Sequence, residues 1–588
     1  MPHLRRIFAD LDDGPVEHEA CADAATVLHL SADESERRSE LDWLVLWMTP
    51  STPVGSDRMR APLREVLRIA SINGCQTIVV EHHYVCHDWQ SEHEAFWVSR
   101  HEARAPEAPR LHFFGHRLQA DDLYDPPPGT PYLGFSVLRP VPMGPGGRTL
   151  LRAPPWLERS VLCTVTEHPS LFGTAYEITG VPFMQQDVEL LSCAHAAVWQ
   201  AHYVAQGRGL AARRWTAQIA ELTAGASRPR ASEGLTAEQM RASLAALELP
   251  TIFWDVEDLP DLPGELPTEL HGDWASFVDD DHKPTSGPRL GPDRAIPPGV
   301  MREQLLRSLC RSVNSGFPGI VLAEGDGGLH AVNVVGWIRR CDLPVDRRPN
   351  SRQDACDEDV VLVVCDDQSG PYELVGDVLT DRRGRWYALI LPALERIELS
   401  GEAAEERAFA HVKTSARRYA AAQEPHARTD APLDEADEDL AALAPHIREL
   451  RGDISVRVQL VEGRALKAAI CAQGRGRDAA RVYRLARLPK WVWVAEFHDR
   501  ALRGTGEPCV MAEVVLDTTS HDSVPITLLS CTLRTAKDAA RLRAGESRTT
   551  ATGTGPGRPW GQLRKITGGL SGLPRADAAS NLGQLQTG

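Results

Sequence analysis

The stretch Val181-Pro-Phe-Met-Gln-Gln-Asp-Val-Glu-Leu-Leu-Ser-Cys-Ala-His-Ala-Ala-Val-Trp199 decides how this chain is interpreted. From Cys193 onward it is apolar and rich in alanine, which predicts a buried helix beginning at the cysteine. The first backbone N–H groups of a helix have no partner within it, and they favour an anion such as a thiolate. We therefore predict that Cys193 is a nucleophile.

Two strand-like segments downstream supply the groups that such a nucleophile needs. Leu329-His-Ala-Val-Asn-Val-Val-Gly-Trp337 predicts a strand that carries His330 as the base, and the strand at 360–364 ends at a pair of aspartates. An imidazole base needs a hydrogen-bond acceptor on its second nitrogen. We expect Asp366 in this role, with Asp367 as the alternative, because adjacent strand residues point to opposite faces.

An oxyanion donor is the fourth part of such a site. Gln186, or its neighbour Gln185, could supply a side-chain amide, and the backbone N–H of Cys193 could supply a second donor. Each signal alone has an ordinary structural explanation: a buried thiol, a strand histidine, or an Asp-Asp turn. The order Gln, Cys, His and Asp along the chain is what favours catalysis.

These segments resemble the papain-like cysteine peptidases, and within them the bacterial C39-like peptidases. Residues 181–187 are similar to the family's Val-Pro-Tyr-x-x-Gln opening, and 192–197 resemble its nucleophile helix. Residues 234–240 resemble the following helix, 316–323 and 330–337 the strand pair with the histidine, and 365–372 the Asn-Asp-Pro strand end. The resemblance implies a catalytic set of Cys193, His330, Asp366 and Gln186.

The same resemblance implies a fold and a reaction. It predicts a papain-like domain, in which the cysteine helix packs on an antiparallel sheet carrying the histidine and aspartate, and a peptidase that hydrolyses a peptide or amide bond. The chain departs from the family pattern at Ala194-His195, where Gly-Pro is usual, and at Asp367, where proline is usual. An acyltransferase or protein deamidase on this scaffold, or an inactive binding module, stays open as an alternative.

The order of predicted elements, helices first and strands after, indicates an α+β fold. We expect six segments: a flexible N-terminus at 1–40, an α/β segment at 41–160, the papain-like domain at 161–400, a helix and acidic linker at 401–445, a small β-rich region at 446–540, and a disordered tail at 541–588. Residues 249–290 read as an exposed insertion. Thr236-Ala-Glu-Gln239 predicts a capping box that opens a helix.

The composition restricts the partners. A formal net charge of −17 argues against nucleic acid, which needs a basic surface. No apolar run approaches the ~20 residues that span a bilayer, and the start of the chain shows no signal-peptide core. The twelve cysteines form no CxxC pair, which favours reduced thiols in a cytoplasm. We expect a protein or peptide substrate, no cofactor and no metal, and leave the oligomeric state open.

A second cluster lies in the N-terminal half. Glu81-His-His-Tyr-Val-Cys-His-Asp-Trp-Gln-Ser-Glu-His-Glu94 is dense in imidazoles and carboxylates, with His101, His112 and His116 nearby. Such side chains bind zinc or iron, but the spacing matches no metal-binding motif. We therefore interpret these histidines as local strand and turn residues.

Overall fold

The computed structural model of the chain describes residues 14–21, 24–49, 57–99, 104–187, 189–224, 234–255, 298–325, 328–348, 360–375, 386–394, 397–408, 454–472, 488–499 and 510–519. The chain divides into two compact units. The first comprises Met1–Leu259 and Gly316–Ala393, and the second comprises Pro260–Ser315 and Leu394–Gly588. All four predicted site residues belong to the first unit.

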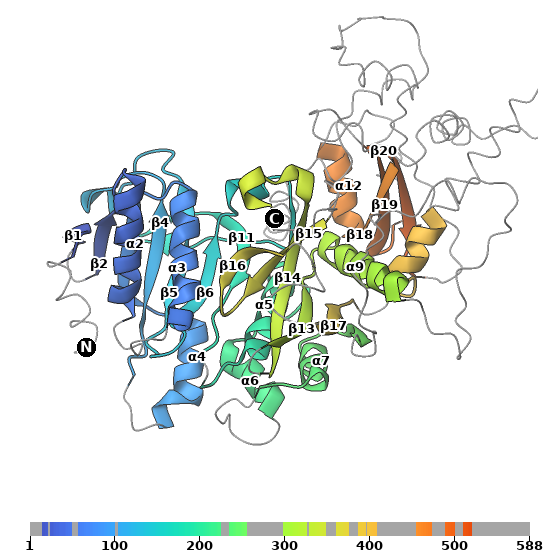
Figure 1. Cartoon of the computed structure of the whole chain (residues 1–588), viewed down its shortest axis with the longest axis horizontal. Coiled ribbons are helices and arrows are strands. Elements are labelled where there is room, and N and C mark those ends of the chain that lie inside the picture. The colour runs from blue at the N-terminus through green and yellow to red at the C-terminus, as the bar shows by residue number, and fades with distance from the viewer. Residues whose placement is uncertain are drawn as a thin grey trace, which may run out of the picture. The chain divides into compact units, whose positions relative to one another are not determined.

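The expected α+β class is confirmed, since helices accompany antiparallel sheets in the described residues (Figure 1). The first unit contains an eight-stranded sheet in the order β1-β2-β3-β4-β5-β6-β11-β8. Its strands are β1 (Glu17–Cys21), β2 (Ala25–His29), β3 (Thr77–Tyr84), β4 (Ala108–Phe114), β5 (Tyr132–Leu138), β6 (Gly146–Leu151), β8 (Val165–Glu167) and β11 (Ile178–Phe183). The sheet includes strands from both sides of residue 160, where the sequence analysis placed a segment boundary, because β11 pairs with β6.

Two helices, α2 (Glu34–Met48) and α3 (Asp57–Ile72), cover one face of this sheet (Figure 1). Their apolar sides bury Leu44, Val45 and Leu67 completely. The expectation of a flexible segment at 1–40 is wrong for the part that the structure describes, because β2 is buried along its whole length and pairs with β3. The polar composition suggested flexibility because the exposed edge strand β1 carries charged residues, which are common at the edge of a sheet.

The second sheet of this unit runs β12-β17-β13-β14-β15-β16, and β7 also pairs with β14. Its strands are β7 (Val161–Leu162), β12 (Thr251–Asp255), β13 (Gly319–Gly325), β14 (Gly328–Arg339), β15 (Val360–Asp366), β16 (Gly370–Val375) and β17 (Trp386–Pro392). Most of β13, β14 and β15 matches strands expected from the sequence. The sequence missed β12, which begins inside the expected insertion, and β16, which follows the aspartate turn.

Two helices, α5 (Cys193–Gly207) and α7 (Ala237–Ala246), pack on this second sheet, and α6 (Thr216–Ala224) packs against both of them. Helix α5 is held to β14 where the Asn333 side-chain amide donates to the carbonyl of Ala197 at 3.1 Å. The predicted capping box is confirmed: Thr236 Oγ1 accepts from the N–H of Gln239, whose side chain accepts from the N–H of Thr236.

One side chain joins the two sheets. The hydroxyl of buried Tyr372, on β16, donates to the carbonyl of Leu151 on β6 at 2.7 Å. The same oxygen accepts from the N–H of Val181 on β11 at 2.8 Å. Because β16 follows the aspartate pair and β11 leads toward Cys193, this contact links the segments that carry the predicted site residues.

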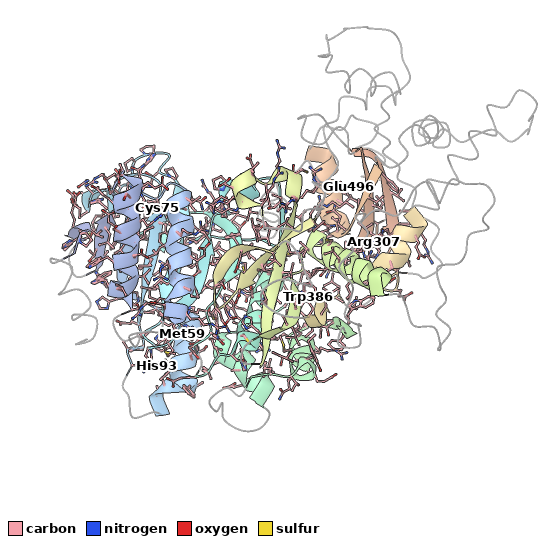
Figure 2. All side chains as sticks on the ribbon, viewed as in Figure 1. Met59, Cys75, His93, Arg307, Trp386 and Glu496 are labelled. Carbon is pink, nitrogen blue, oxygen red and sulfur yellow. The ribbon has the colours of Figure 1, made fainter. Side chains whose placement is uncertain are left out.

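Shorter elements complete the first unit. They are helix α4 (His87–Ala95), the 3₁₀ turns η1 (Trp97–Ser99), η2 (Asp121–Leu123), η3 (Pro155–Leu157), η4 (Arg340–Asp342) and η5 (Val345–Arg347), and a small hairpin of β9 (Ser170–Leu171) and β10 (Thr174–Ala175). Figure 2 shows the side chains between the ribbons, with Cys75 labelled near the two helices α2 and α3.

The second unit is built on a three-stranded antiparallel sheet of β18 (Ile454–Glu462), β19 (Trp491–Asp499) and β20 (Val510–Asp517), which lie within the region 446–540 that was expected to be β-rich. Helix α12 (Gly463–Ala472) follows β18. Helix α9 (Pro298–Asn314) also belongs here, since the Asn314 side chain donates to the carbonyl of Val458. Arg311 on α9 forms ion pairs with Glu402 and Glu405.

Several expectations fall outside the described residues. They are most of the insertion at 249–290, the acidic linker, and the tail at 541–588. Among the described residues, no helix is both long enough and apolar enough to cross a bilayer.

Candidate functional site

Cys193 is the first residue of α5, as the sequence predicted, and Ser192 is its N-cap. The thiol is partly exposed, whereas residues 194–205 of the helix are buried. Burial raises the pKa values of Cys75, Cys163 and Cys365 to about 12, so these thiols stay protonated at neutral pH. Cys193 thus differs from these three in being reachable by solvent at a helix N-terminus.

The Ala194-His195 departure from the peptidase pattern has a structural role. His195 occupies the third position of α5, where its Nδ1 accepts from the N–H of Ser192 at 3.3 Å and is 2.8 Å from the Ser192 hydroxyl. A glutamate or glutamine usually makes this reciprocal capping bond. Burial lowers the pKa of His195 to about 4, which keeps the accepting nitrogen unprotonated at neutral pH. His195 therefore caps the helix that carries the thiol.

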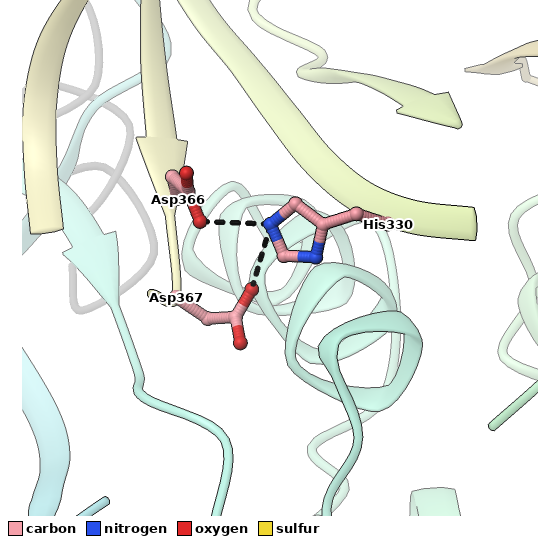
Figure 3. A group of neighbouring side chains, drawn as sticks. All are labelled: His330, Asp366 and Asp367. Atoms are coloured by element: carbon pink, nitrogen blue, oxygen red, sulfur yellow. Dashed lines mark hydrogen bonds and ion pairs between the residues drawn. The ribbon is translucent and has the colours of Figure 1, made fainter. Parts of the chain in front are cut away.

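His330 lies on β14 and faces the end of β15. Its Nε2 is 2.9 Å from Asp366 Oδ1 and 3.7 Å from Asp367 Oδ1, and Figure 3 shows both carboxylates turned toward this nitrogen. Both reach the ring because the pairing of β15 with β16 shifts register between Val364 and Asp366, which breaks the strict alternation of faces. Asp366 is the nearer partner, in the place expected for the orienting carboxylate.

Asp366 is held firmly. Its Oδ1 also accepts from the N–H of Gln368 at 2.9 Å, and its Oδ2 accepts from the Ser369 hydroxyl at 3.1 Å. These bonds come from the turn that follows β15. They fix the carboxylate, and through it the orientation of the His330 ring.

The His330 imidazole is strongly biased toward its charged form. Burial opposes the charge, but hydrogen bonds with Asp366 and with the Cys193 thiol, and the charges of Asp366 and Asp367, outweigh it and raise the pKa of His330 to about 10. An imidazolium in contact with a thiol favours the thiolate. The structure thus brings Cys193, His330 and Asp366 together.

Asp367 is buried with a different environment. It is only 5% exposed, and neither of its carboxylate oxygens accepts a hydrogen bond from the described part of the chain. Burial, with the like charge of Asp366, raises the pKa of Asp367 to about 7, although the charge of His330 opposes the rise. His330, Asp366 and Asp367 are also the described residues whose potential metal-ligand atoms all lie within 4.8 Å of one another.

The two glutamines behave differently from each other. Gln185 is buried, accepts from the N–H of Gly146 at 3.1 Å, and donates to the carbonyl of Met59 at 2.8 Å. Its side chain is thereby committed to backbone groups, and the alternative that it donates to an oxyanion is wrong. Gln186 is half-buried and is not among the described residues that line the cavity beside Cys193, so its oxyanion role stays a prediction.

Asp187 and Arg139 build the turn before the nucleophile, and the sequence analysis missed both. Asp187 Oδ1 accepts from three successive backbone N–H groups, those of Glu189, Leu190 and Leu191. Buried Arg139 forms ion pairs with Asp187 and Glu92 and donates to the carbonyls of Gly144, Gly146 and Gln185. Gly144 has a φ of +67°, and a Cβ there would lie 1.8 Å from the Gln186 carbonyl oxygen.

A small polar cavity of about 10 Å³ adjoins the thiol, and its lining includes Cys193, Gln200, Asn333 and Asp367. The Asn333 side chain donates to Gln200 Oε1 at 2.7 Å, and Gln200 donates to the carbonyl of Pro182. This network fixes α5 against β14 and β11. A larger cavity of about 260 Å³, lined in part by Glu167 and Arg213, lies beside the other end of α5, away from the predicted site residues.

Gln368 is a further neighbour of the base that sequence reasoning missed. Its Nε2 is 3.2 Å from His330 Nδ1, and its Oε1 accepts from Arg58 on α3. Its position beside Asp366-Asp367 could have suggested such a contact. Nothing local could have suggested Arg58, which lies 310 positions away.

The N-terminal histidines have separate partners in the described residues. His112 contacts Tyr132 at 2.8 Å and Glu81 at 3.2 Å, His83 pairs with Glu107 at 2.8 Å, and His93 contacts the Arg104 carbonyl at 3.0 Å (His93 is labelled in Figure 2). Burial lowers the pKa of His112 to about 4. His83 and His112 lie on strands, as interpreted, whereas His93 lies on helix α4 rather than on a strand or turn.

Comparison of the chain with protein families, curated proteins and solved structures finds no match.

Proposed function

We propose that the chain is a cysteine hydrolase of papain-like type that cleaves a peptide or amide bond of a protein or peptide. In this proposal the helix that begins at Cys193, packed on the antiparallel sheet of His330 and Asp366, is a papain-like arrangement. The observation that carries the proposal is the His330 ring, which bonds Asp366 through Nε2 and also contacts the Cys193 thiol. That combination is what thiol catalysis requires.

The chemistry follows from the proton positions. The thiolate of Cys193 attacks the substrate carbonyl carbon, and the imidazolium of His330 gives its proton to the leaving amine as the C–N bond breaks. The neutral imidazole then takes a proton from water, whose oxygen attacks the thioester, and returns it to the departing sulfur. Asp366 keeps the Nε2 proton in place, so that Nδ1 is the nitrogen that exchanges protons with sulfur.

Oxyanion stabilisation would come from the Cys193 backbone N–H at the start of α5, with Gln186 as the predicted second donor. Loss of one such donor typically costs about 3–4 kcal/mol of transition-state stabilisation. Gln186 would have to turn toward the thiol when substrate binds.

One observation favours a second candidate, a papain-like binding module without turnover. The Gln368 amide lies 3.2 Å from His330 Nδ1, and the cavity beside the thiol is only about 10 Å³. An amide that keeps this position would compete with the thiol for the imidazole.

Alkylation with iodoacetamide at pH 6 tests the proposal. An ordinary cysteine, with a pKa of about 8.5, is roughly 0.3% ionised at pH 6. We expect Cys193 to react about ten- to a hundredfold faster than the exposed Cys341, and His330→Ala to remove this difference. Peptide mass spectrometry gives the rate for each thiol.

His83→Ala is the matched control, because His83 also pairs with a carboxylate but lies far along the chain from the thiol. It should leave the Cys193 rate unchanged. Equal rates for Cys193 and Cys341 in the unaltered chain would contradict the hydrolase and favour the binding module.

A further inference from the structure

The cluster of His330, Asp366 and Asp367 has one carboxyl group more than the hydrolase needs. Two carboxylates converge on a single ring nitrogen, at 2.9 and 3.7 Å (Figure 3). An imidazolium balances only one of these charges. Asp366 alone is sufficient to orient the ring, so the second carboxylate requires another explanation.

Asp367 is the informative member of the cluster. Its side chain is 4% exposed, and neither oxygen has a hydrogen-bond partner among the residues that the structure describes. Burying a carboxylate without hydrogen bonds is costly, and buried charges in proteins are normally paired or bound to a metal ion. Oδ1 forms an ion pair with His330 Nε2 at 3.7 Å, so a carboxylate without a hydrogen bond from the described residues lies within the cluster.

The spacing of the three atoms suits a metal ion. Nitrogen and oxygen ligands lie about 2.0–2.2 Å from zinc, so at octahedral or tetrahedral angles they are roughly 2.8–3.6 Å apart. The observed separation of 2.9 Å falls in that range, and that of 3.7 Å lies just above it. The backbone N–H of Gln368 and the hydroxyl of Ser369 already bind Asp366, as the outer hydrogen bonds of a metal site do.

We propose that His330 Nε2, Asp366 and Asp367 form a binding site for a first-row divalent cation of the zinc class. One imidazole with two carboxylates is a mixed nitrogen and oxygen donor set of the kind that zinc accepts. The ion replaces the Nε2 proton, which leaves to solvent, and its two positive charges balance both carboxylates. Solvent ligands complete the coordination.

Occupation of this site has a consequence for the thiol. With the ion on Nε2, the ring keeps only its Nδ1 proton, and the nearby positive charge opposes a second proton. The metal-bound form therefore cannot hold the imidazolium that pairs with the Cys193 thiolate, and the ion acts as an inhibitor. This consequence rests on the proposed function, whereas binding of the ion does not.

Isothermal titration of the full chain with ZnCl₂, after removal of metal with EDTA, tests the site. We expect saturable binding of one ion, weakened at least about tenfold by Asp367→Asn, which keeps the side-chain shape and removes the charge. Glu107→Gln is the matched control, since it alters another His–carboxylate pair, His83–Glu107, and should leave the affinity unchanged.

Two further arms separate this site from zinc bound to the thiol. Cys193→Ser should retain the ion, and a Co²⁺ complex of the unaltered chain should lack a thiolate charge-transfer band. Absence of saturable binding up to millimolar zinc, equal affinity in Asp367→Asn, or loss of binding in Cys193→Ser would overturn the proposal. Circular dichroism checks that each variant is folded, and if Asp367→Asn is not, the Co²⁺ spectrum and Cys193→Ser still decide. Alkylation of Cys193 tests the hydrolase separately, so either proposal can fail alone.

Discussion

The two sides of the candidate site are built in opposite ways. On the thiol side, the turn before Cys193 has its charges paired: Asp187 takes three backbone N–H groups and an ion pair, and Arg139 serves two carboxylates and three carbonyls. On the imidazole side, the Asp366 carboxylate accepts hydrogen bonds, whereas the Asp367 carboxylate accepts none from the described residues.

This difference suggests that the charged groups on the thiol side maintain the conformation of the site, whereas those on the imidazole side determine its reactivity. A buried charged group whose partners are all backbone and fixed side chains holds a loop in one conformation. A buried carboxylate without a hydrogen-bond partner is stabilised when it binds a proton or a cation. The thiol side is therefore expected to respond to mutation through stability, and the imidazole side through reactivity.

The largest effect should come from Arg139→Met, which breaks the thiol side. Removing one partner from a buried ion pair leaves uncompensated charge, here on Glu92 and Asp187, and the free energy of unfolding should fall by about 3–5 kcal/mol. Urea unfolding measures it. The control Arg64→Met breaks an exposed pair with Asp42 and should lower it by less than about 1 kcal/mol. Similar losses in both variants would remove the contrast between the two sides.

A second effect on the thiol side depends on pH. The unfolded His195 has a pKa near 6.5, and the folded one about 4, so between these values the unfolded chain binds more protons. Stability from His195 is full above pH 6.5 and is lost as the pH falls toward 4, by on the order of 3 kcal/mol. His195→Gln, which keeps the capping bond, should reduce this acid loss in unfolding experiments from pH 7 to 4.

If His195→Gln unfolds with acid as steeply as the unaltered chain, His195 does not cause the loss. Buried His112, whose pKa is also about 4, would then be the next residue to replace.

The smallest predicted effect tests the imidazole side. Asp366→Asn keeps an acceptor oxygen near His330 Nε2 but removes the charge that favours the imidazolium, so alkylation of Cys193 at pH 6 should slow about tenfold, or 1.4 kcal/mol. Asp367→Asn removes the more distant carboxylate, 3.7 Å from His330 Nε2, and should change the rate by less than about half that energy. A larger effect of Asp367→Asn would reverse the roles assigned to the two aspartates.

Local patterns predicted the parts of this site that depend on local structure. An apolar run beginning at Cys193 gave the helix start, and alternating apolar runs placed His330 and Asp366 on strands. The α+β class followed from the order of elements. Each of these inferences needs only neighbours in the sequence, where helix and strand periodicity operate.

The remainder depends on contacts between distant segments. Arg139 lies 48 positions before Asp187, and Arg58 lies 310 before Gln368. Gln185 resembled an oxyanion donor because its neighbours matched a motif, but Gly146 and Met59 occupy its amide. The register shift that turns both aspartates toward His330 arises from pairing with β16, a strand that the turn-like sequence concealed.

Tyr372 gives this architecture a mechanical property. Its hydroxyl oxygen forms hydrogen bonds between the sheet whose strand β11 leads to Cys193 and the sheet that carries His330. Separation of the two sheets would require these two hydrogen bonds to break. The backbone hydrogen bonds within each sheet would not have to break. Breaking the two hydrogen bonds of Tyr372 would then misalign sulfur and imidazole while both sheets stayed folded.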